Sequence, residues 1–86
     1  MKHRTLPSFW RAYDRLPGAL QKKADESYAL WKNDPTHPSL EFKQVGDLRG
    51  ARIDSGYRAL AYVAGDSIIW FWIGPHDEYL RLIRTR

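Results

Sequence analysis

The 86-residue sequence contains no cysteine, and it has no apolar run long enough to cross a membrane. Without cysteine, the chain cannot form disulfide bonds, thiolate metal sites or a thiol nucleophile. The first ten residues also lack the apolar segment of a secretory signal peptide. These absences predict a cytoplasmic protein with no membrane partner.

Motifs for cofactors and metals are missing as well. The sequence has no phosphate-binding loop, no dinucleotide-binding glycine pattern and no nucleophile elbow. Its three histidines, His3, His37 and His76, do not have the spacing of metal ligands. We therefore expect neither a metal nor a cofactor. His3 lies in a terminus expected to fray and His37 in a loop, so His76 is the histidine of interest.

What the sequence does contain is basic charge and many large aromatic side chains. The formal net charge is +4, and there are four tryptophans, five tyrosines and three phenylalanines. A chain of this length forms one domain, residues 1–86, near the lower size limit for an independent core, and its aromatics compensate because each buries a large area. The charge suits a nucleic acid or an acidic protein partner, and it is equally consistent with an ordinary basic surface.

The spacing of apolar residues changes partway along the chain. Helical spacing over residues 6–16 and 18–32 predicts two helices, with Ser8 as the cap of the first. From residue 40 the period becomes two, which predicts strands at about 40–43, 51–54, 56–63 and 68–73. Gly74-Pro75 is expected to end the last strand, and residues 77–84 can form a short C-terminal helix.

This order of elements predicts an α+β fold, in which an N-terminal helical hairpin packs on a four-stranded, mainly antiparallel sheet. At least one of Trp70 and Trp72 is expected to be buried against Trp31 and Tyr28. By alternation, the face of the sheet away from the hairpin collects mostly charged residues: Glu41, Lys43, Arg52, Arg58 and Tyr62. Three cations on an open face favour an anionic ligand, and nearby aromatic side chains can stack on bases.

Two residues on adjacent predicted strands suggest a chemistry. Arg58 lies early in one strand and His76 just after the next, and in an antiparallel pair these positions come close together. Arginine binds phosphate bidentately and histidine transfers protons near neutral pH, which suffices for metal-free RNA cleavage through the substrate's 2′-hydroxyl. In the alternative interpretation, Arg58 is a surface cation paired with Glu41 or Asp54, and His76 caps the terminal helix.

Four features of the chain form a combination typical of a known family. They are the predicted helical hairpin, the Pro-Thr-His-Pro-Ser-Leu stretch at 35–40, the Ser-Gly-Tyr-Arg stretch at 55–58 and the Ile-Gly-Pro-His stretch at 73–76. With them the sequence, over about residues 8–83, resembles the RelE/ParE superfamily of toxins from bacterial type II toxin–antitoxin modules. The family implies an RNA-binding sheet surface and a cognate antitoxin partner. Its RelE-like members cleave mRNA in the ribosomal A site without a metal, whereas its ParE-like members inhibit DNA gyrase.

The resemblance carries over to individual positions. Arg58 matches the arginine that stabilises the scissile phosphate, and Arg52 matches a basic strand residue of the same site. His76 lies where nuclease members have an arginine or a histidine, so the implied catalytic residues are Arg58, His76 and Arg52. Tyr79 either replaces the aromatic that stacks on substrate in several nucleases or only packs. The expected substrate-binding residues are Tyr79 together with Lys43 and Tyr62, which are assigned from their predicted face.

Three functions follow, in order of preference. The first is a metal-independent mRNA endoribonuclease toxin, acting on free or ribosome-bound mRNA and neutralised by an antitoxin. The second is a gyrase-directed toxin of the same fold, against which the presence of Arg58 and His76 argues. The third is a non-catalytic binding module or an inactive toxin remnant.

Overall fold

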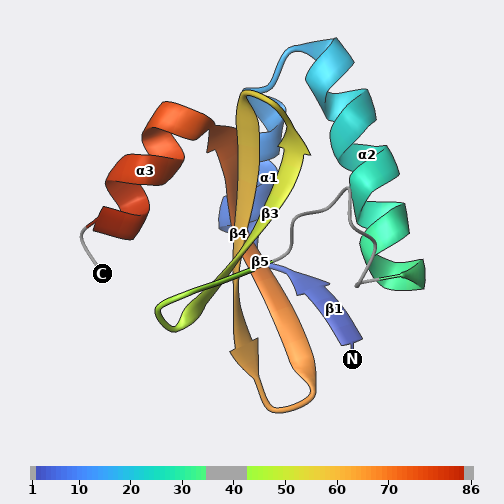
Figure 1. The fold of residues 1–86 in the computed structure, drawn as a ribbon. Helices are drawn as coiled ribbons and strands as arrows, with labels where there is room; N and C mark the ends of the chain where they lie inside the picture. The colour runs from blue at the N-terminus through green and yellow to red at the C-terminus, as the bar shows by residue number, and fades with distance from the viewer. Residues whose placement is uncertain (1, 35–42, 85–86) are drawn as a thin grey trace.

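The computed structural model describes residues 2–34 and 43–84, and it has the predicted α+β architecture (Figure 1). The helices and strands follow one another along the chain in this order: β1 (Lys2–Thr5), α1 (Pro7–Asp14), α2 (Gly18–Asn33), β2 (Lys43–Val45), β3 (Leu48–Asp54), β4 (Tyr57–Ala64), β5 (Ser67–Pro75) and α3 (His76–Arg84). His37, Glu41 and most of the strand predicted at 40–43 lie outside the described residues. No helix within the described ranges is long and apolar enough to span a bilayer.

The two N-terminal helices are separated as the sequence predicts, but the first is not capped by Ser8. Helix α1 begins at Pro7, whose missing N–H is tolerated in the first turn. The predicted cap is wrong because the hydroxyl of Ser8 donates instead to the carbonyl oxygen of Phe71, at 2.7 Å. That bond ties the start of α1 to strand β5.

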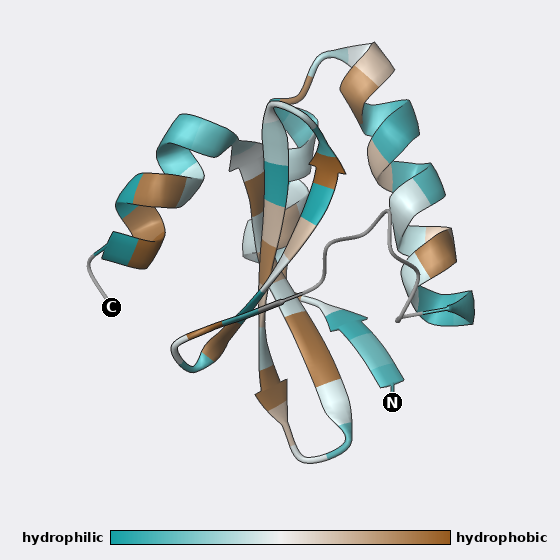
Figure 2. Cartoon of the chain, in the orientation of Figure 1, coloured by the Kyte–Doolittle hydropathy of each residue, from teal (hydrophilic) through white to brown (hydrophobic). Residues whose placement is uncertain are grey.

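The sheet has one strand more than the sequence predicts. Its order is β1-β5-β4-β3-β2, with β1 parallel to β5 and all other pairs antiparallel. His3, expected in a frayed terminus, lies in β1, and its Nδ1 accepts a hydrogen bond of 3.0 Å from Nε1 of Trp70. Burial, with a smaller effect from the charge of Lys32, lowers the pKa of His3. Strand β1 is hydrophilic along its length (Figure 2), so no apolar alternation indicates it in the sequence.

The main core lies between the hairpin and one face of the sheet. Trp70 is fully buried and stacks on Trp31, with ring centroids 4.1 Å apart, which confirms the expected burial of a tryptophan there. Small buried residues of the central strands, Ala51, Ala59 and Ala61, line the same face of the sheet.

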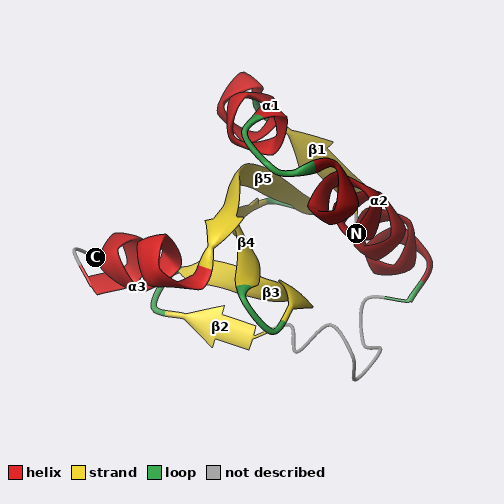
Figure 3. Ribbon diagram, turned by 90° about the horizontal axis from the view of Figure 1, so that it is seen from above, coloured by secondary structure: helices red, strands yellow, loops and turns green. Residues whose placement is uncertain are grey.

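The sequence predicts that the opposite face of the sheet is open, but in the structure part of this face is covered. Helix α3 lies on the side of the sheet away from α1 and α2 (Figure 3) and forms a second apolar cluster there. Leu48, Leu60 and Tyr79 are the buried residues of that cluster. The charged positions of this face are therefore accessible beside α3, not across the entire sheet.

Candidate functional site

Arg52 and Arg58 lie directly opposite each other on the two central antiparallel strands. Their Cα atoms are paired in the β3–β4 register, so both side chains stand on the face that also carries Leu60. Directly opposite residues have Cβ atoms about 4.5–5.5 Å apart, and like charges in such a pair destabilise a sheet. Both arginines are partly buried, which weakens screening by water. This arrangement favours an anion.

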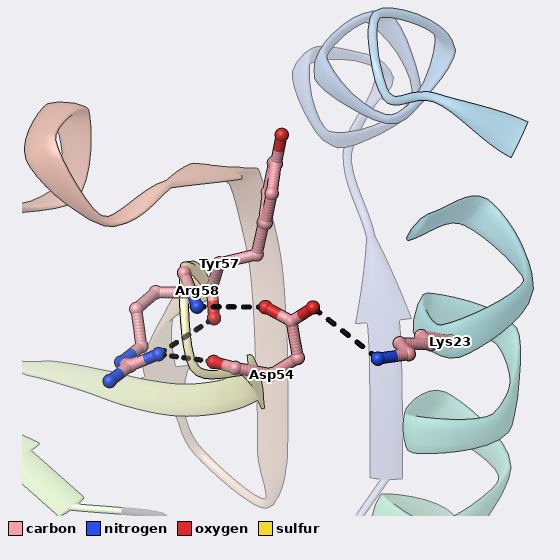
Figure 4. Close-up of polar contacts among 5 residues, drawn as sticks. Lys23, Asp54, Tyr57 and Arg58 are labelled. Atoms are coloured by element: carbon pink, nitrogen blue, oxygen red, sulfur yellow. Dashed lines mark hydrogen bonds and ion pairs between the residues drawn. The ribbon is translucent and has the colours of Figure 1, made fainter. Parts of the chain in front are cut away.

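The guanidinium of Arg58 is held in place by backbone carbonyls. Its Nη1 donates to the carbonyl oxygens of Asp54, at 2.6 Å, and of Tyr57, at 2.9 Å. The carboxylate of Asp54 accepts a hydrogen bond from the backbone N–H of Gly56 and forms an ion pair with Lys23, at 3.5 Å (Figure 4). Among the described residues, Nε and Nη2 of Arg58 have no partner, so the Arg58–Asp54 side-chain pair of the alternative interpretation does not form.

His76 is positioned by the same turn. It is the first residue of α3, and its backbone N–H donates to the carbonyl oxygen of Gly56 at 2.8 Å. Gly74 is the register partner of Arg58 and Pro75 that of Tyr57, so the predicted closeness of the two strand ends is confirmed.

The imidazole of His76 is partly exposed and lies 5.6 Å from the ring of Tyr79, centroid to centroid. Within residues 2–34 and 43–84 it accepts or donates no hydrogen bond, and so makes no capping interaction there. The ring is therefore available for proton transfer.

Tyr79 does not fit the stacking role proposed from the sequence. Only 4% of its surface is exposed, because this residue of α3 packs against Leu48 and Leu60 of the sheet. The ring also lies close over Gly50, where the Cβ of any other residue would meet its hydroxyl oxygen at 3.1 Å. The alternative role, packing, is the one the structure supports. The periodicity of a short helix indicates which residues share a face, but not which of them the sheet covers.

Of the other two predicted substrate-binding residues, Tyr62 lies away from the arginine pair, whereas the backbone of Lys43 lies on the strand next to Arg52. Tyr62 is exposed on the same face as Arg58 but four residues further along β4, about 13 Å away. Its ring is next to Phe71, with 6.0 Å between centroids. Lys43 begins β2 and is the register partner of Gly50. The structure thus brings Arg52, Arg58 and the backbone of His76 together, with Tyr62 at the far end of the strand.

Lys23, on the second helix, is a residue of the site that no local sequence pattern indicates. Its ion pair with Asp54 depends on how α2 lies against β3. Within the described residues, no cluster of three or more histidine, aspartate and glutamate side chains could hold a metal ion.

Comparisons with known structures show which proteins share this fold. A chain of the RelB–RelE antitoxin–toxin complex from Methanococcus jannaschii is similar, with a TM-score of 0.74 and 17% identity over 92% of this chain and 96% of that one. A YoeB/ParE toxin from Agrobacterium tumefaciens has a TM-score of 0.66, with 17% identity over 88% of this chain and 99% of that one. The RelE–RelB complex from Pyrococcus horikoshii has a TM-score of 0.62, with 22% identity over 86% and 92%.

No protein-family model and no curated protein sequence matches the chain. At these identities the structural matches show the fold alone. Their coverage, nine-tenths or more of each matched chain, means that the whole domain corresponds and not only the sheet.

Proposed function

We propose that this chain, whose fold is that of RelE- and YoeB-type toxins, is the toxin of a type II toxin–antitoxin module and cleaves mRNA without a metal. One observation carries the proposal. Arg52 and Arg58 face each other across two strands, and Arg58 keeps Nε and Nη2 without a partner among the described residues, beside the residue that starts α3. A like-charge pair that lowers stability is understandable where a phosphate has to bind.

The reaction needs only the substrate's own nucleophile. The 2′-oxygen attacks the adjacent phosphorus while the bond from phosphorus to the 5′-oxygen of the next nucleotide breaks. The products are a 2′,3′-cyclic phosphate and a 5′-hydroxyl, so one proton leaves the 2′-oxygen and one reaches the 5′-oxygen.

Arg58 binds the phosphate through Nε and Nη2 and stabilises the added negative charge of the transition state. Arg52 contributes a second positive charge from the neighbouring strand. His76 transfers one of the two protons, a role that imidazole fills well near neutral pH.

The partner that would restrain this activity is an antitoxin. Two of the similar structures are complexes of RelE with RelB, which supports the assignment of such a partner here. A basic surface left uncovered binds cellular RNA non-specifically, so an acidic antitoxin segment over Arg52 and Arg58 would block both binding and cleavage. A toxin–antitoxin complex that binds RNA as tightly as the free toxin would contradict this part of the proposal.

The central experiment expresses the wild-type chain and the Arg58→Ala variant in bacteria and follows protein synthesis, DNA damage signalling and mRNA ends over time. We expect rapid arrest of translation and new mRNA ends with the wild type, and neither with the variant. An early DNA damage response with intact mRNA would instead indicate a gyrase-directed toxin, and no arrest at all would indicate a binding module or an inactive remnant. Cleavage of a short RNA by purified protein in the presence of a chelator tests metal independence.

A further inference from the structure

The turn between β3 and β4 places one carboxylate between two cations. Asp54 lies at the start of this turn, with Arg58 on β4 just after the turn and Lys23 on α2. Its Oδ2 is 3.5 Å from Nζ of Lys23, and its Oδ1 accepts the N–H of Gly56 at 2.9 Å. Its backbone carbonyl, in contrast, accepts from Arg58 at 2.6 Å. In Figure 4 the carboxylate points towards Lys23, and the guanidinium lies on the other side of the turn.

The direction of the Asp54 carboxylate decides whether the positive charge of Arg58 is neutralised within the protein or left for a ligand. A carboxylate on a side chain whose own carbonyl contacts the guanidinium is within a short rotation of pairing with it, and arginine pairs with carboxylates bidentately. Such a pair would occupy Nε and Nη2, the groups that a phosphate needs. The β-bulge between Arg52 and Asp54 helps to set the present direction, because a bulge re-aims the side chains next to it.

The ion pair with Lys23 has little value as a support for the fold. The side chains of Lys23 and Asp54 are 55% and 24% exposed, and exposed ion pairs of this kind contribute little to stability. Its effect on the direction of the carboxylate is therefore more significant than its effect on folding.

We infer that Lys23 is a positioning residue: by holding the carboxylate of Asp54 on the α2 side of the turn, it leaves Arg58 free to bind a substrate phosphate. This inference rests on the proposed function for the identity of the anion, since Arg58 is the phosphate-binding residue there. It adds a residue from the helical hairpin, on the other side of the sheet, to the determinants of the site.

The test uses four variants and an RNA that cannot be cleaved. Lys23→Gln removes the charge that holds the carboxylate, and Asp54→Asn keeps the acceptor for Gly56 but removes its charge. The double variant combines them, and Lys22→Gln, at the neighbouring exposed lysine of α2, is the control for loss of one positive charge. Binding is measured by fluorescence anisotropy with a 2′-O-methyl dodecamer, which lacks the attacking hydroxyl, so affinity is separated from chemistry.

We expect Lys23→Gln to bind the 2′-O-methyl RNA about threefold to tenfold more weakly than Lys22→Gln does, because a freed carboxylate competes with the phosphate. The double variant should bind like Lys22→Gln, since the competing charge is gone. Both single-lysine variants should melt within a few degrees of the wild type. If Lys23 had a purely structural role, removing the charge of Asp54 would not restore RNA binding in the double variant.

Equal binding by Lys23→Gln and Lys22→Gln, or a double variant as weak as Lys23→Gln, would overturn the inference. Failure of the proposed function has a different signature, which is Arg58-dependent binding of the 2′-O-methyl RNA without any cleavage of the unmodified RNA.

A second probe, inorganic phosphate, is titrated while the Nε–Hε resonance of Arg58 is followed by NMR. A response in the wild type that is reduced by Lys23→Gln and restored in the double variant supports the inference without RNA, and no response in the wild type overturns it.

Discussion

Replacing Arg58 with alanine should abolish RNA cleavage while leaving the protein folded. The guanidinium makes its hydrogen bonds to two carbonyl groups of the turn and is not part of either apolar cluster. Its proposed contribution is a bidentate contact to the phosphate that strengthens as charge develops. Losing a preorganised donor of this kind costs about 3 kcal/mol of transition-state stabilisation, which is on the order of 10²-fold in rate.

The cost to stability should be much smaller. Each hydrogen bond lost from the charged guanidinium lowers the free energy of unfolding by about 1.5–3 kcal/mol. Most of this loss is offset because water can donate hydrogen bonds to the two freed carbonyl oxygens beside the turn. Removing Arg58 also relieves its repulsion with Arg52, a cross-strand term of about 0.2–1 kcal/mol. We therefore expect a net loss of about 1 kcal/mol, which for a chain of this size lowers the melting temperature by roughly 4–8 °C.

The assay is the single-turnover cleavage rate of a short RNA in the presence of a chelator, measured alongside thermal unfolding. Arg11→Ala, at an exposed arginine of α1, is the matched control for charge and should retain the wild-type rate. Arg58→Lys should recover only part of the activity, because an ammonium lacks the planar fork. A folded Arg58→Ala protein that cleaves at more than a tenth of the wild-type rate, or that still arrests growth fully, would refute the assignment of Arg58.

Three further predictions concern residues around the site and the core. His76→Gln should bind the uncleavable RNA normally and lose about 10²–10⁴-fold in cleavage rate, and near-equal rates for the two proteins would leave His76 without an acid–base role. Trp70→Ala should destabilise the fold by about 3–5 kcal/mol in denaturant unfolding, because Trp70 is fully buried against Trp31, and an unchanged midpoint would contradict this packing. Because the pKa of His3 is lowered below 6.5 by burial, the unfolded chain binds its proton more readily, so this contribution to stability is complete above pH 6.5 and is lost as the pH falls towards the folded pKa. His3→Asn keeps an acceptor for Trp70 but does not titrate, so its melting temperature should fall less than that of the wild type between about pH 7.5 and about pH 5.5, and an equal fall would show that His3 is not responsible.

The sequence by itself determined the elements whose pattern is local. The apolar spacing that predicts α1 and α2, and the alternation and apolar run that predict β3, β4 and β5, arise from side chains a few residues apart, so no distant contact is needed to recognise them. The antiparallel order follows from the short connections. The pairing of Arg58 with the end of β5 follows from that order, which is why part of the candidate site was predictable.

The tertiary structure decided the features that depend on a distant partner. Strand β1 has no apolar alternation of its own and exists because the edge of β5 offers backbone partners and Trp70 offers a hydrogen bond to His3. Tyr79 is buried because α3 folds back over Leu48 and Leu60, a contact that helical periodicity cannot assign to one residue.

The availability of Arg58 was decided in the same way. Whether the carboxylate of Asp54 pairs with Arg58 or turns away depends on Lys23, which is 31 residues earlier in the chain and reaches the turn only when α2 packs beside β3. A local sequence pattern can identify the charged residues of the turn. It cannot determine which opposite charges meet, because that depends on the three-dimensional packing of the helical hairpin on the sheet.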